Sequence, residues 1–389
     1  MISISRLLCD SHGPGDSLRY GEAPPGSIKA TTPAPVVVWN CTCRCNLQCI
    51  HCYAAANDSK ELTEVDTAAG KKLISSLAGF GVPVLLFSGG EPLMREDLIE
   101  LARFAVASGL RVVLSTNGTL IDERSAKELQ ETGFSEIGIS LDGTETINDR
   151  FRGRDGAYQE TLKGIRNCRE QGLRISLRFT ITRFNYQEIP AVFSLAEQEH
   201  VDRLCFYHLA YSGRGTNLVN ADITAEQTRE VVDTICEHTR KLHARGLPKE
   251  VLTVANHADG VNLYLNLQEK NPERASLVYS LLRRNGGNKT GIKIGAVDPS
   301  GNVYPDQFWR NHSLGNVFER DFGEIWSDTR NPLMKALKER RKLLKGRCGE
   351  CRYLEICNGN LRQRAEAVYD DIWAEDPACY LTEEEIGVG

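Results

Sequence analysis

The sequence predicts an α/β fold built on a parallel sheet. Three observations support this: six short apolar runs lie between residues 36 and 207, segments of helical length separate them, and the runs are continuous rather than alternating. Strands that alternate with helices imply parallel βαβ units. Continuous apolar runs fit strands buried on both faces. Right-handed crossovers then leave two arrangements, an open sheet and a partial barrel.

Each of the first five predicted strands is followed by a predicted helix. The strands are expected at 36–39, 84–87, 111–114, 137–141, 175–181 and 204–207. The helices are expected at 64–77, 96–107, 123–131, 158–171 and 187–199. In such folds the side chains that do chemistry gather at the carboxyl ends of the strands. Functional residues are therefore expected just after each apolar run.

The second half of the chain is less regular. It contains helical patterns at 224–243 and 272–284, a mixed segment at 252–260, and a hairpin at 292–304 around an Asp-Pro-Ser-Gly-Asn turn. The first 30 residues are rich in Gly, Pro and Ser and are expected to be irregular, as a covering arm or mobile leader. The expected divisions are an arm at 1–32, a barrel at 33–215, a helical connection at 216–290 and a C-terminal domain at 291–389.

Composition narrows the class of protein. The 389 residues are 41% hydrophobic and 25% charged, and the net charge of −5 argues against a general nucleic-acid binder. The N-terminus lacks the apolar stretch of a signal peptide, and no apolar run approaches the ~20 residues that span a bilayer. We expect a cytoplasmic protein without a membrane partner. Thirteen cysteines, an odd number, then indicate metal binding rather than disulfides.

Three of these cysteines follow the first predicted strand. Cys45, Cys49 and Cys52 are spaced CxxxCxxC. Three thiolates this close can hold three irons of a [4Fe-4S] cube and leave the fourth iron open. An open coordination position distinguishes a reactive metal site from a structural one. The alternative is a zinc site with His51 as a further ligand, but the triplet spacing is not typical of zinc.

Short polar motifs end the next three strands. They are Ser88-Gly89-Gly90-Glu91-Pro92, then residues 115–118 and 140–143. With the cysteine triplet, these motifs resemble the radical S-adenosylmethionine (SAM) superfamily. The resemblance implies a partial (β/α)6 TIM-like barrel. It also implies that SAM binds the open iron through its amino and carboxylate groups, and that reduction releases a 5′-deoxyadenosyl radical.

The resemblance also indicates which residues bind SAM. Gly89 and Gly90 would allow the backbone to approach SAM closely, and Glu91 would supply local negative charge. Arg178, on the fifth strand, either pairs with the SAM carboxylate or forms a salt bridge at the barrel rim. The other expected contacts are Ser88, Asn117, Ser140 and Asp142.

A second cysteine group lies near the C-terminus: Cys348, Cys351, Cys357 and Cys379. Four thiolates close a site, and spacing alone suits either zinc or a second [4Fe-4S] cluster. The region resembles the SPASM/twitch-like iron-sulfur domain of radical SAM enzymes, which implies an auxiliary cluster. It departs from the full SPASM pattern at Leu361, which stands where a further cysteine is expected, and in the hairpin, which has none. We therefore expect two [4Fe-4S] clusters, one that binds SAM and one auxiliary.

Across nearly its whole length the chain resembles the NirJ/AhbC/AhbD family of haem and haem d1 biosynthesis. The resemblance rests on segments such as 207–215, 252–260, 286–291, 305–309, 357–367 and 373–382. It implies an iron tetrapyrrole substrate and an electron donor such as flavodoxin or ferredoxin. The chain looks most like the AhbC type, which removes two acetate side chains from 12,18-didecarboxysirohaem to give iron-coproporphyrin III.

Several alternatives stay open. An AhbD-like enzyme would oxidatively decarboxylate iron-coproporphyrin III, and a NirJ-like enzyme would serve haem d1 biosynthesis. Two alternatives are more distant: a peptide-modifying SPASM maturase, and a haem-binding carrier that retains a cluster. SAM cleavage under reducing conditions separates an enzyme from a carrier.

A tetrapyrrole with many carboxylates favours arginine side chains in its site. Arg150, Arg152 and Arg154 are expected together in a loop at the barrel mouth, and Arg214 in a glycine-containing loop after the sixth strand. An exposed basic loop is the alternative explanation. His208 and His257 are candidate axial ligands for the substrate iron.

Overall fold

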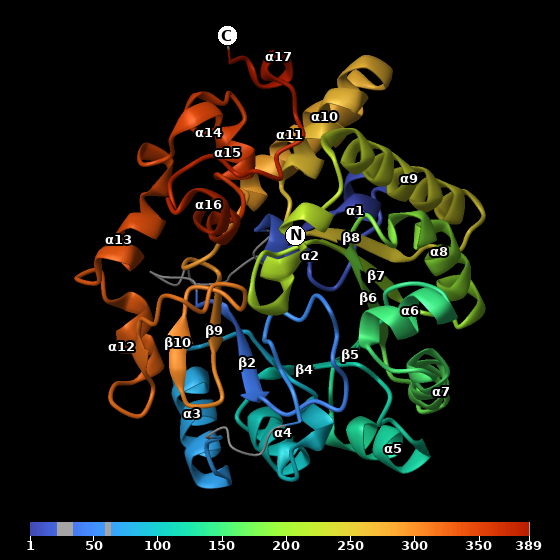
Figure 1. Cartoon of the computed structure of the whole chain (residues 1–389), viewed down its shortest axis with the longest axis vertical. Coiled ribbons are helices and arrows are strands. Elements are labelled where there is room, and N and C mark those ends of the chain that lie inside the picture. Colours follow the sequence, from blue (N-terminus) through green and yellow to red (C-terminus); the bar gives the residue numbers. More distant parts are fainter. Residues whose placement is uncertain (22–33, 59–63, 389) are drawn as a thin grey trace.

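The computed structural model describes residues 1–21, 34–58 and 64–388. Their strands form one 11-stranded sheet in the order β1-β8-β7-β6-β5-β4-β3-β2-β9-β10-β11 (Figure 1). Neighbouring strands from β2 to β7 are all parallel. These six are β2 (Val36–Thr42), β3 (Val84–Gly89), β4 (Arg111–Thr116), β5 (Glu136–Ser140), β6 (Ile175–Ile181) and β7 (Arg203–His208). The predicted α/β fold is confirmed.

Helices alternate with these strands and lie around the outside of the sheet in Figure 1. The predicted ones are α3 (Thr67–Gly79), α4 (Leu98–Ala107), α5 (Glu123–Thr132), α7 (Ala157–Glu170) and α8 (Ile189–Gln198). The sequence missed α6 (Glu145–Arg152), a two-turn helix where a loop was expected. It ends at Gly153, whose left-handed backbone suits glycine.

The sheet is wider than the expected six strands. β8 (Glu250–Val254) adds in parallel beside β7, and β9 (Ile294–Val297) adds in parallel beside β2. The predicted hairpin is confirmed as β9 and β10 (Asn302–Tyr304), with β11 (Gly315–Asn316) beyond it. The linear strand order has two free edges among the described residues, so the barrel is partial.

The N-terminal residues are not irregular, and that expectation is wrong for residues 1–20. β1 (Ile2–Ser3) pairs antiparallel with β8 and is followed by α1 (Ile4–Cys9) and α2 (Asp16–Tyr20). Ile2, Ile4, Leu7 and Tyr20 are buried in the main core, because side chains of this strand and these helices cover the edge of the sheet. Residues 22–32 of the expected arm lie outside the described residues.

The second half of the chain is mostly helical. Thr224 caps α9 (Ala225–Ala244), and its side chain and that of Gln227 form a capping box. α10 (Ala258–Lys270) and α11 (Pro272–Asn285) follow, so the mixed segment ends β8 and begins a helix. The C-terminal elements are α12 (Phe322–Ser327), α13 (Pro332–Lys338), α14 (Gly346–Glu350), α15 (Leu354–Cys357), α16 (Arg362–Tyr369) and α17 (Glu383–Ile386).

A buried ion pair attaches the C-terminal region to the barrel. Arg364 of α16 and Asp376 are both fully buried and lie 2.7 Å apart. Arg364 also donates to the carbonyl oxygens of Leu209 and Ala255, just beyond the ends of β7 and β8. A buried guanidinium needs this complete set of acceptors. The pair therefore fixes α16 against the carboxyl end of the sheet.

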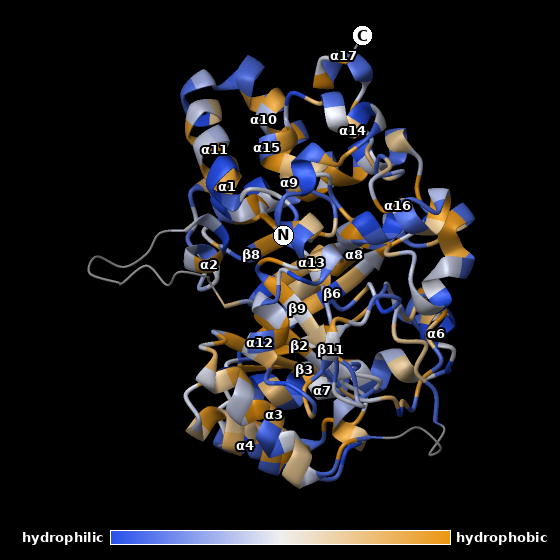
Figure 2. Cartoon of the chain, turned by 90° about the vertical axis from the view of Figure 1, so that its left-hand side faces the viewer, coloured by the Kyte–Doolittle hydropathy of each residue, from blue (hydrophilic) through white to orange (hydrophobic). Residues whose placement is uncertain are grey.

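Apolar residues concentrate along the strands and on the helix faces turned toward them (Figure 2). One core cluster joins the sheet, its covering helices and part of the C-terminal region. None of the helices formed by the described residues is long and apolar enough to cross a membrane.

Candidate active site

The cysteine loop continues β2 at the carboxyl end of the sheet. Its backbone is fixed by α6, because the amides of Gln48 and Ile50 donate to the carbonyls of Arg152 and Phe151 at 3.1 and 3.0 Å. On the other side, the amide of Cys45 donates to the carbonyl of Asn57 at 2.9 Å. These bonds hold the loop against the end of α6 on one side and against its own later residues on the other.

Gly89 and Gly90 hold the start of this loop. A Cβ atom on Gly89 would lie 2.3 Å from the carbonyl oxygen of Thr42, and one on Gly90 would lie 2.0 Å from that of Arg44. Gly89 also has a φ of +131°, which favours glycine. The close backbone approach that we predicted for SAM is thus already made with the cysteine loop.

Glu91 is fully buried and joins the ends of β3 and β4. Its carboxylate accepts from Thr116 Oγ1 and the Asn117 amide at 2.7 Å each, and from the Leu93 amide at 3.1 Å. Burial raises the pKa of Glu91 to about 7, although the three hydrogen-bond donors lower it. Its contacts position Asn117, and Glu91 itself does not line the cavity described below.

Arg152, Asp142 and His51 form a buried charged group beside the cysteines. Arg152 Nη2 lies 2.6 Å from the Asp142 carboxylate, and His51 Nε2 lies 3.2 Å from it. Arg152 Nη1 also donates to Cys49 Sγ at 3.6 Å. Asp142 is fully buried and accepts from the Thr180 amide. Asp142 and Arg152 thus contact one another and their neighbours in the protein, while the contacts predicted between SAM and Asp142, and between substrate and Arg152, stay predictions.

Arg214 also contacts the cysteine loop. Its side chain donates to the carbonyl oxygens of Cys49 and Ala56 at 2.7 Å each, and its amide donates to that of Cys52 at 3.0 Å. Three bonds from one residue immobilise two turns of the loop. Arg214 thus positions the cysteines, whereas the sequence suggested substrate binding.

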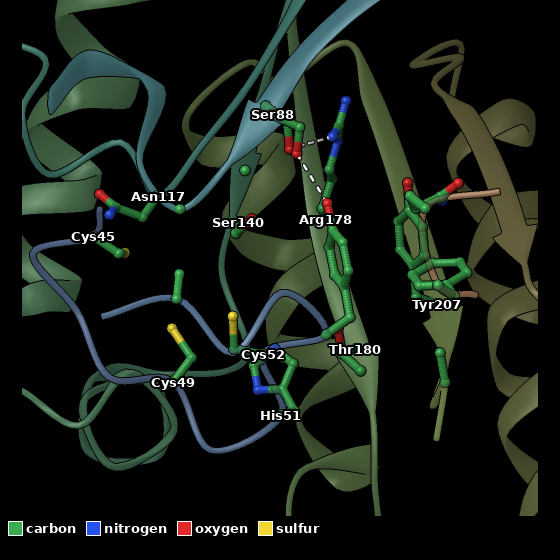
Figure 3. A pocket seen from close by; sticks show the side chains of 18 of the residues that line it. Cys45, Cys49, His51, Cys52, Ser88, Asn117, Ser140, Arg178, Thr180 and Tyr207 are labelled. Atoms are coloured by element: carbon green, nitrogen blue, oxygen red, sulfur yellow. Dashed lines mark hydrogen bonds between the residues drawn. The ribbon is translucent and has the colours of Figure 1, made fainter. Parts of the chain in front are cut away.

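The cysteine side chains face a cavity at the carboxyl ends of the strands, here called the upper cavity (Figure 3). It has about 1120 Å³ of free space, part of it open to solvent. Within it, Arg178 Nη1 donates to Ser115 Oγ at 2.6 Å, and Asn117 Nδ2 donates to Asn46 Oδ1 at 2.9 Å. The predicted residues on its wall are Cys45, Cys49, Cys52, Ser88, Gly89, Gly90, Asn117, Ser140, Arg178, Arg152 and His208.

The remaining predicted substrate residues do not share one site. Arg150 is exposed and lies over the ring of Phe184, and Arg154 pairs with Glu160. With Arg152 turned toward Cys49, the three arginines form no common cluster. Arg150 and Arg152 belong to α6 and Arg154 lies just beyond its end, and the three side chains have different partners, so the predicted cluster does not form.

The two candidate histidines already have protein partners. His208 Nε2 lies 2.9 Å from Asp259 Oδ2, and His257 Nδ1 lies 3.3 Å from Asn360 Oδ1. Burial lowers the pKa of His257 well below its usual value. Contacts within the protein thus account for the position of both imidazole rings.

The second cysteine group gathers where α14 and α15 meet the C-terminal segment. Cys348, Cys351, Cys357 and Cys379 all line one small cavity with about 410 Å³ of free space, part of it open to solvent. Burial raises the pKa of Cys357 well above its usual value and that of Cys379 to about 12. Such thiols stay protonated until a cationic centre compensates their charge. Leu361, the departure from the SPASM pattern, packs instead on β8 residues.

Both cysteine sets fit clusters better than single ions. No three His, Cys, Asp or Glu side chains in the described parts of the chain are close enough to hold one metal ion. The thiols of each set nevertheless line one cavity. In an iron-sulfur cluster several irons lie between the thiolates, so wider spacing is acceptable. A tetrahedral zinc site needs all its ligands around one ion.

The fold and the two cysteine sites define a radical SAM enzyme with an auxiliary iron-sulfur domain. Residues 39–196 match the radical SAM superfamily, and residues 291–352 match the SPASM iron-sulfur cluster-binding domain. The SPASM match includes Cys348 and Cys351, and Cys357 and Cys379 follow it. SAM and iron-sulfur clusters are the cofactors that these two matches show.

Curated relatives identify the family. The chain is 54% identical to the Fe-coproporphyrin III synthase of Methanosarcina barkeri, with 100% of this chain and 99% of that protein covered. It is 40% identical to the pre-heme d1 synthase of Dinoroseobacter shibae (95% and 91% covered) and 31% identical to the AdoMet-dependent heme synthase of M. barkeri (90% and 97% covered). The chain belongs to this family of radical SAM enzymes, as the sequence resemblance predicted.

Solved structures confirm the fold. SuiB of Streptococcus suis, bound to S-adenosylmethionine, superposes with a TM-score of 0.70 at 17% identity, covering 90% of this chain and 78% of SuiB. Native anSMEcpe with bound AdoMet and a peptide gives 0.67 at 20% identity, covering 91% and 95%. At these identities the likeness concerns the fold alone.

Sequence reasoning missed several residues of the upper cavity. Tyr53, directly after the last cysteine, bonds Asn40 and Ser88 through its hydroxyl at 2.9 and 3.1 Å. Thr180 and Tyr207 lie on β6 and β7 and face the same space in Figure 3. Side chains alternate between the two faces of a strand, so the positions of Thr180 and Tyr207 on their strands could have indicated that they face the barrel interior.

Proposed function

We propose that this enzyme removes two acetate side chains from 12,18-didecarboxysirohaem to give iron-coproporphyrin III. The observation that carries the proposal is the order of identities within the family. Identity is 54% to Fe-coproporphyrin III synthase, with the whole chain covered, against 40% and 31% for the two other activities. The SPASM-type cysteines and the large upper cavity are compatible with all three activities, so the support for this one comes from sequence identity.

Within this proposal, the two cysteine sets have different tasks. Cys45, Cys49 and Cys52 would hold three irons of a [4Fe-4S] cluster, and SAM would bind the fourth. When bound and reduced, this cluster and SAM supply a 5′-deoxyadenosyl radical for hydrogen abstraction from the substrate. The auxiliary cluster would be held by Cys348, Cys351, Cys357 and Cys379. Four thiolates leave it no open iron, which suits electron transfer to or from the substrate.

In this proposal, other residues around the upper cavity bind SAM and orient the cysteine loop. Ser88, Asn117 and Ser140 offer polar groups to SAM along the strand ends, and Arg178 offers a guanidinium beside them. Arg152 places positive charge at Cys49, and Arg214 fixes the loop backbone. Tyr53, Tyr207 and Phe308 form apolar walls that limit water around the reacting atoms.

The test is anaerobic incubation of the reconstituted enzyme with SAM, dithionite and 12,18-didecarboxysirohaem. We expect 5′-deoxyadenosine and a product with the mass and retention time of iron-coproporphyrin III. Parallel incubations contain iron-coproporphyrin III or a SPASM-type precursor peptide in its place. Turnover of either one instead of didecarboxysirohaem would contradict the proposal. Replacing dithionite by reduced flavodoxin or ferredoxin tests the proposed electron donor.

Pre-heme d1 synthesis is the second candidate. It is favoured by the 40% identity to pre-heme d1 synthase across 95% of this chain. The same incubation distinguishes it, because a tetrapyrrole product other than iron-coproporphyrin III would then accumulate.

A further inference from the structure

A second large cavity lies at the opposite end of the barrel from the cysteine loop. Its wall includes the first residues of several strands, among them Val36, Val84, Arg111, Glu136 and Arg203. We call it the lower cavity. It has about 1380 Å³ of free space, part of it open to solvent.

Cations outnumber acids on this wall. The basic residues are Arg19, Arg111, Arg178, Arg203, Lys289 and Lys293, and the acidic ones are Glu136 and Asp306. Both acids already have partners. Glu136 accepts from Arg203 at 2.6 Å, while Asp306 accepts from the Thr290 hydroxyl at 2.5 Å and the Phe308 amide at 2.9 Å. The cavity therefore keeps an excess of positive charge.

Four of the cations have no carboxylate partner among the described residues: Arg111, Arg178, Lys289 and Lys293. Arg111 Nε donates only to Ser135 Oγ, at 3.2 Å. The two lysines are half-buried and lie one turn apart, because the amide of Lys293 donates to the carbonyl of Lys289 at 2.9 Å. Half-buried cations that lack acidic partners favour an anionic ligand.

The pKa of Lys289 reflects this excess of positive charge. Burial lowers its pKa to about 8, and Lys293, Arg341 and Arg340 add to the effect. Its ammonium is thus partly removed from solvent and surrounded by like charges. A bound carboxylate would relieve both effects, since it supplies the missing opposite charge.

The rest of the wall is apolar and leads toward the SAM site. Val36, Val84, Val113, Val254 and Leu361 line the lower cavity. Four residues line both cavities: Leu86, Arg178, Gln307 and Phe308. Among them, Gln307 Oε1 and Arg178 Nε are buried and have no hydrogen-bond partner. The two cavities thus meet at a wall that offers unused polar atoms.

We propose that the lower cavity binds the tetrapyrrole, with Lys289, Lys293 and Arg111 pairing with its carboxylates. The apolar strand residues contact the macrocycle, and the reacting side chain reaches the SAM site past Arg178 and Phe308. This inference rests on the proposed function for the identity of the ligand. It moves substrate recognition away from the barrel mouth, where the sequence predicted that arginines of two loops would provide it.

The test measures binding rather than turnover. The Lys289→Gln/Lys293→Gln variant is compared with Lys127→Gln/Lys241→Gln, which removes two exposed lysines far from either cavity. The probes are iron-coproporphyrin III and its tetramethyl ester, titrated by Soret absorbance under anaerobic conditions. We expect the cavity variant to bind the free acid about tenfold more weakly or worse, because charged hydrogen bonds are lost. The ester should bind both variants equally, and Lys289→Arg/Lys293→Arg should restore binding of the acid.

Equal dissociation constants for the acid in the two Gln variants would overturn the inference. An equal loss for the acid and the ester would also overturn it, because packing rather than charge would then be responsible. Urea unfolding midpoints of all variants identify misfolding, and Arg111→Gln provides an independent variant on another element. Turnover of didecarboxysirohaem by the wild type, assayed in parallel, tests the proposed function separately. A wild type that fails to turn over while charge-dependent binding holds refutes only the function.

Discussion

The Arg152 guanidinium donates to the sulfur of Cys49 across 3.6 Å. Asp142 lies 2.6 Å from the same guanidinium and holds it in place. A fixed positive charge beside a thiolate ligand stabilises the more negative, reduced form of an iron-sulfur cluster. Arg152 is therefore a positioning residue that also sets the electrostatic potential at the proposed SAM-binding cluster.

The first prediction is that Arg152→Gln lowers the reduction potential of this cluster. A unit charge near the cluster at an effective dielectric of ~20 shifts the potential by on the order of 50 mV or more. Arg152→Lys should keep much of the wild-type value. The measurement is an anaerobic redox titration followed by electron paramagnetic resonance. Arg154→Gln is the control, because Arg154 pairs with Glu160 instead. Equal potentials in Arg152→Gln and wild type would contradict the prediction.

The second prediction separates the two cysteine sites. Cys49→Ala should lose about half of the iron and form no 5′-deoxyadenosine, because the remaining thiolates cannot hold the open cluster. Cys348→Ala should lose a similar share of iron yet still cleave SAM, without making the tetrapyrrole product. Iron content and product mass are measured in the same preparations. Cys43→Ala, a half-buried thiol outside both sets, is the control. SAM cleavage by Cys49→Ala would refute the assignment of the triplet.

The third prediction concerns Glu91. Its carboxylate faces three donors, so the NH2 group of a glutamine would meet an amide or hydroxyl hydrogen. Glu91→Gln should destabilise the fold by about 2 kcal/mol and displace Asn117 from the upper cavity. Urea unfolding and SAM affinity are the measurements. Glu100→Gln, on the exposed face of α4, should change neither. A Glu91→Gln protein with wild-type stability would show that these bonds matter little.

The sequence predicted the parallel α/β core because its signal is local. Each of the six strands of the core is a continuous apolar run, and these runs match β2 to β7. The N-terminal residues were missed for the opposite reason. Ile2 and Ser3 form a strand only because β8 offers an unpaired edge. Tertiary pairing of this kind leaves no periodic pattern in two residues.

The sequence predicted the kind of site better than the partners of its individual side chains. The cysteines lie on the cavity walls where their spacing placed them, because metal-ligand spacing is a local property. The arginines were misjudged because a guanidinium reaches far and its partner depends on the fold. Arg152 and Arg214 face the cysteine loop. Lys289 and Lys293 belong to no motif, and only the folded barrel brings them to a cavity.

The last prediction is a pH dependence of stability caused by Lys289. Its pKa of about 8 in the folded protein lies below the ~10.4 of an unfolded lysine. The folded state therefore binds fewer protons than the unfolded state between these values, and stability rises with pH across that window. Lys289→Met removes the cost of keeping a half-buried ammonium below pH 8. With allowance for partial exposure, the variant should be more stable at pH 7 by about 1–2 kcal/mol.

This advantage should shrink as the pH approaches 10, where Lys289 of the wild type is neutral. Urea midpoints of the cluster-loaded proteins at pH 7 and pH 10 measure it, with Lys127→Met as the exposed control. An advantage of equal size at both pH values would show that methionine packs better and that charge is irrelevant. Saturating iron-coproporphyrin III should reverse the order at pH 7, because the wild-type ammonium then has its carboxylate and the variant does not. A lysine that destabilises the empty protein and stabilises the liganded one is what a binding residue requires.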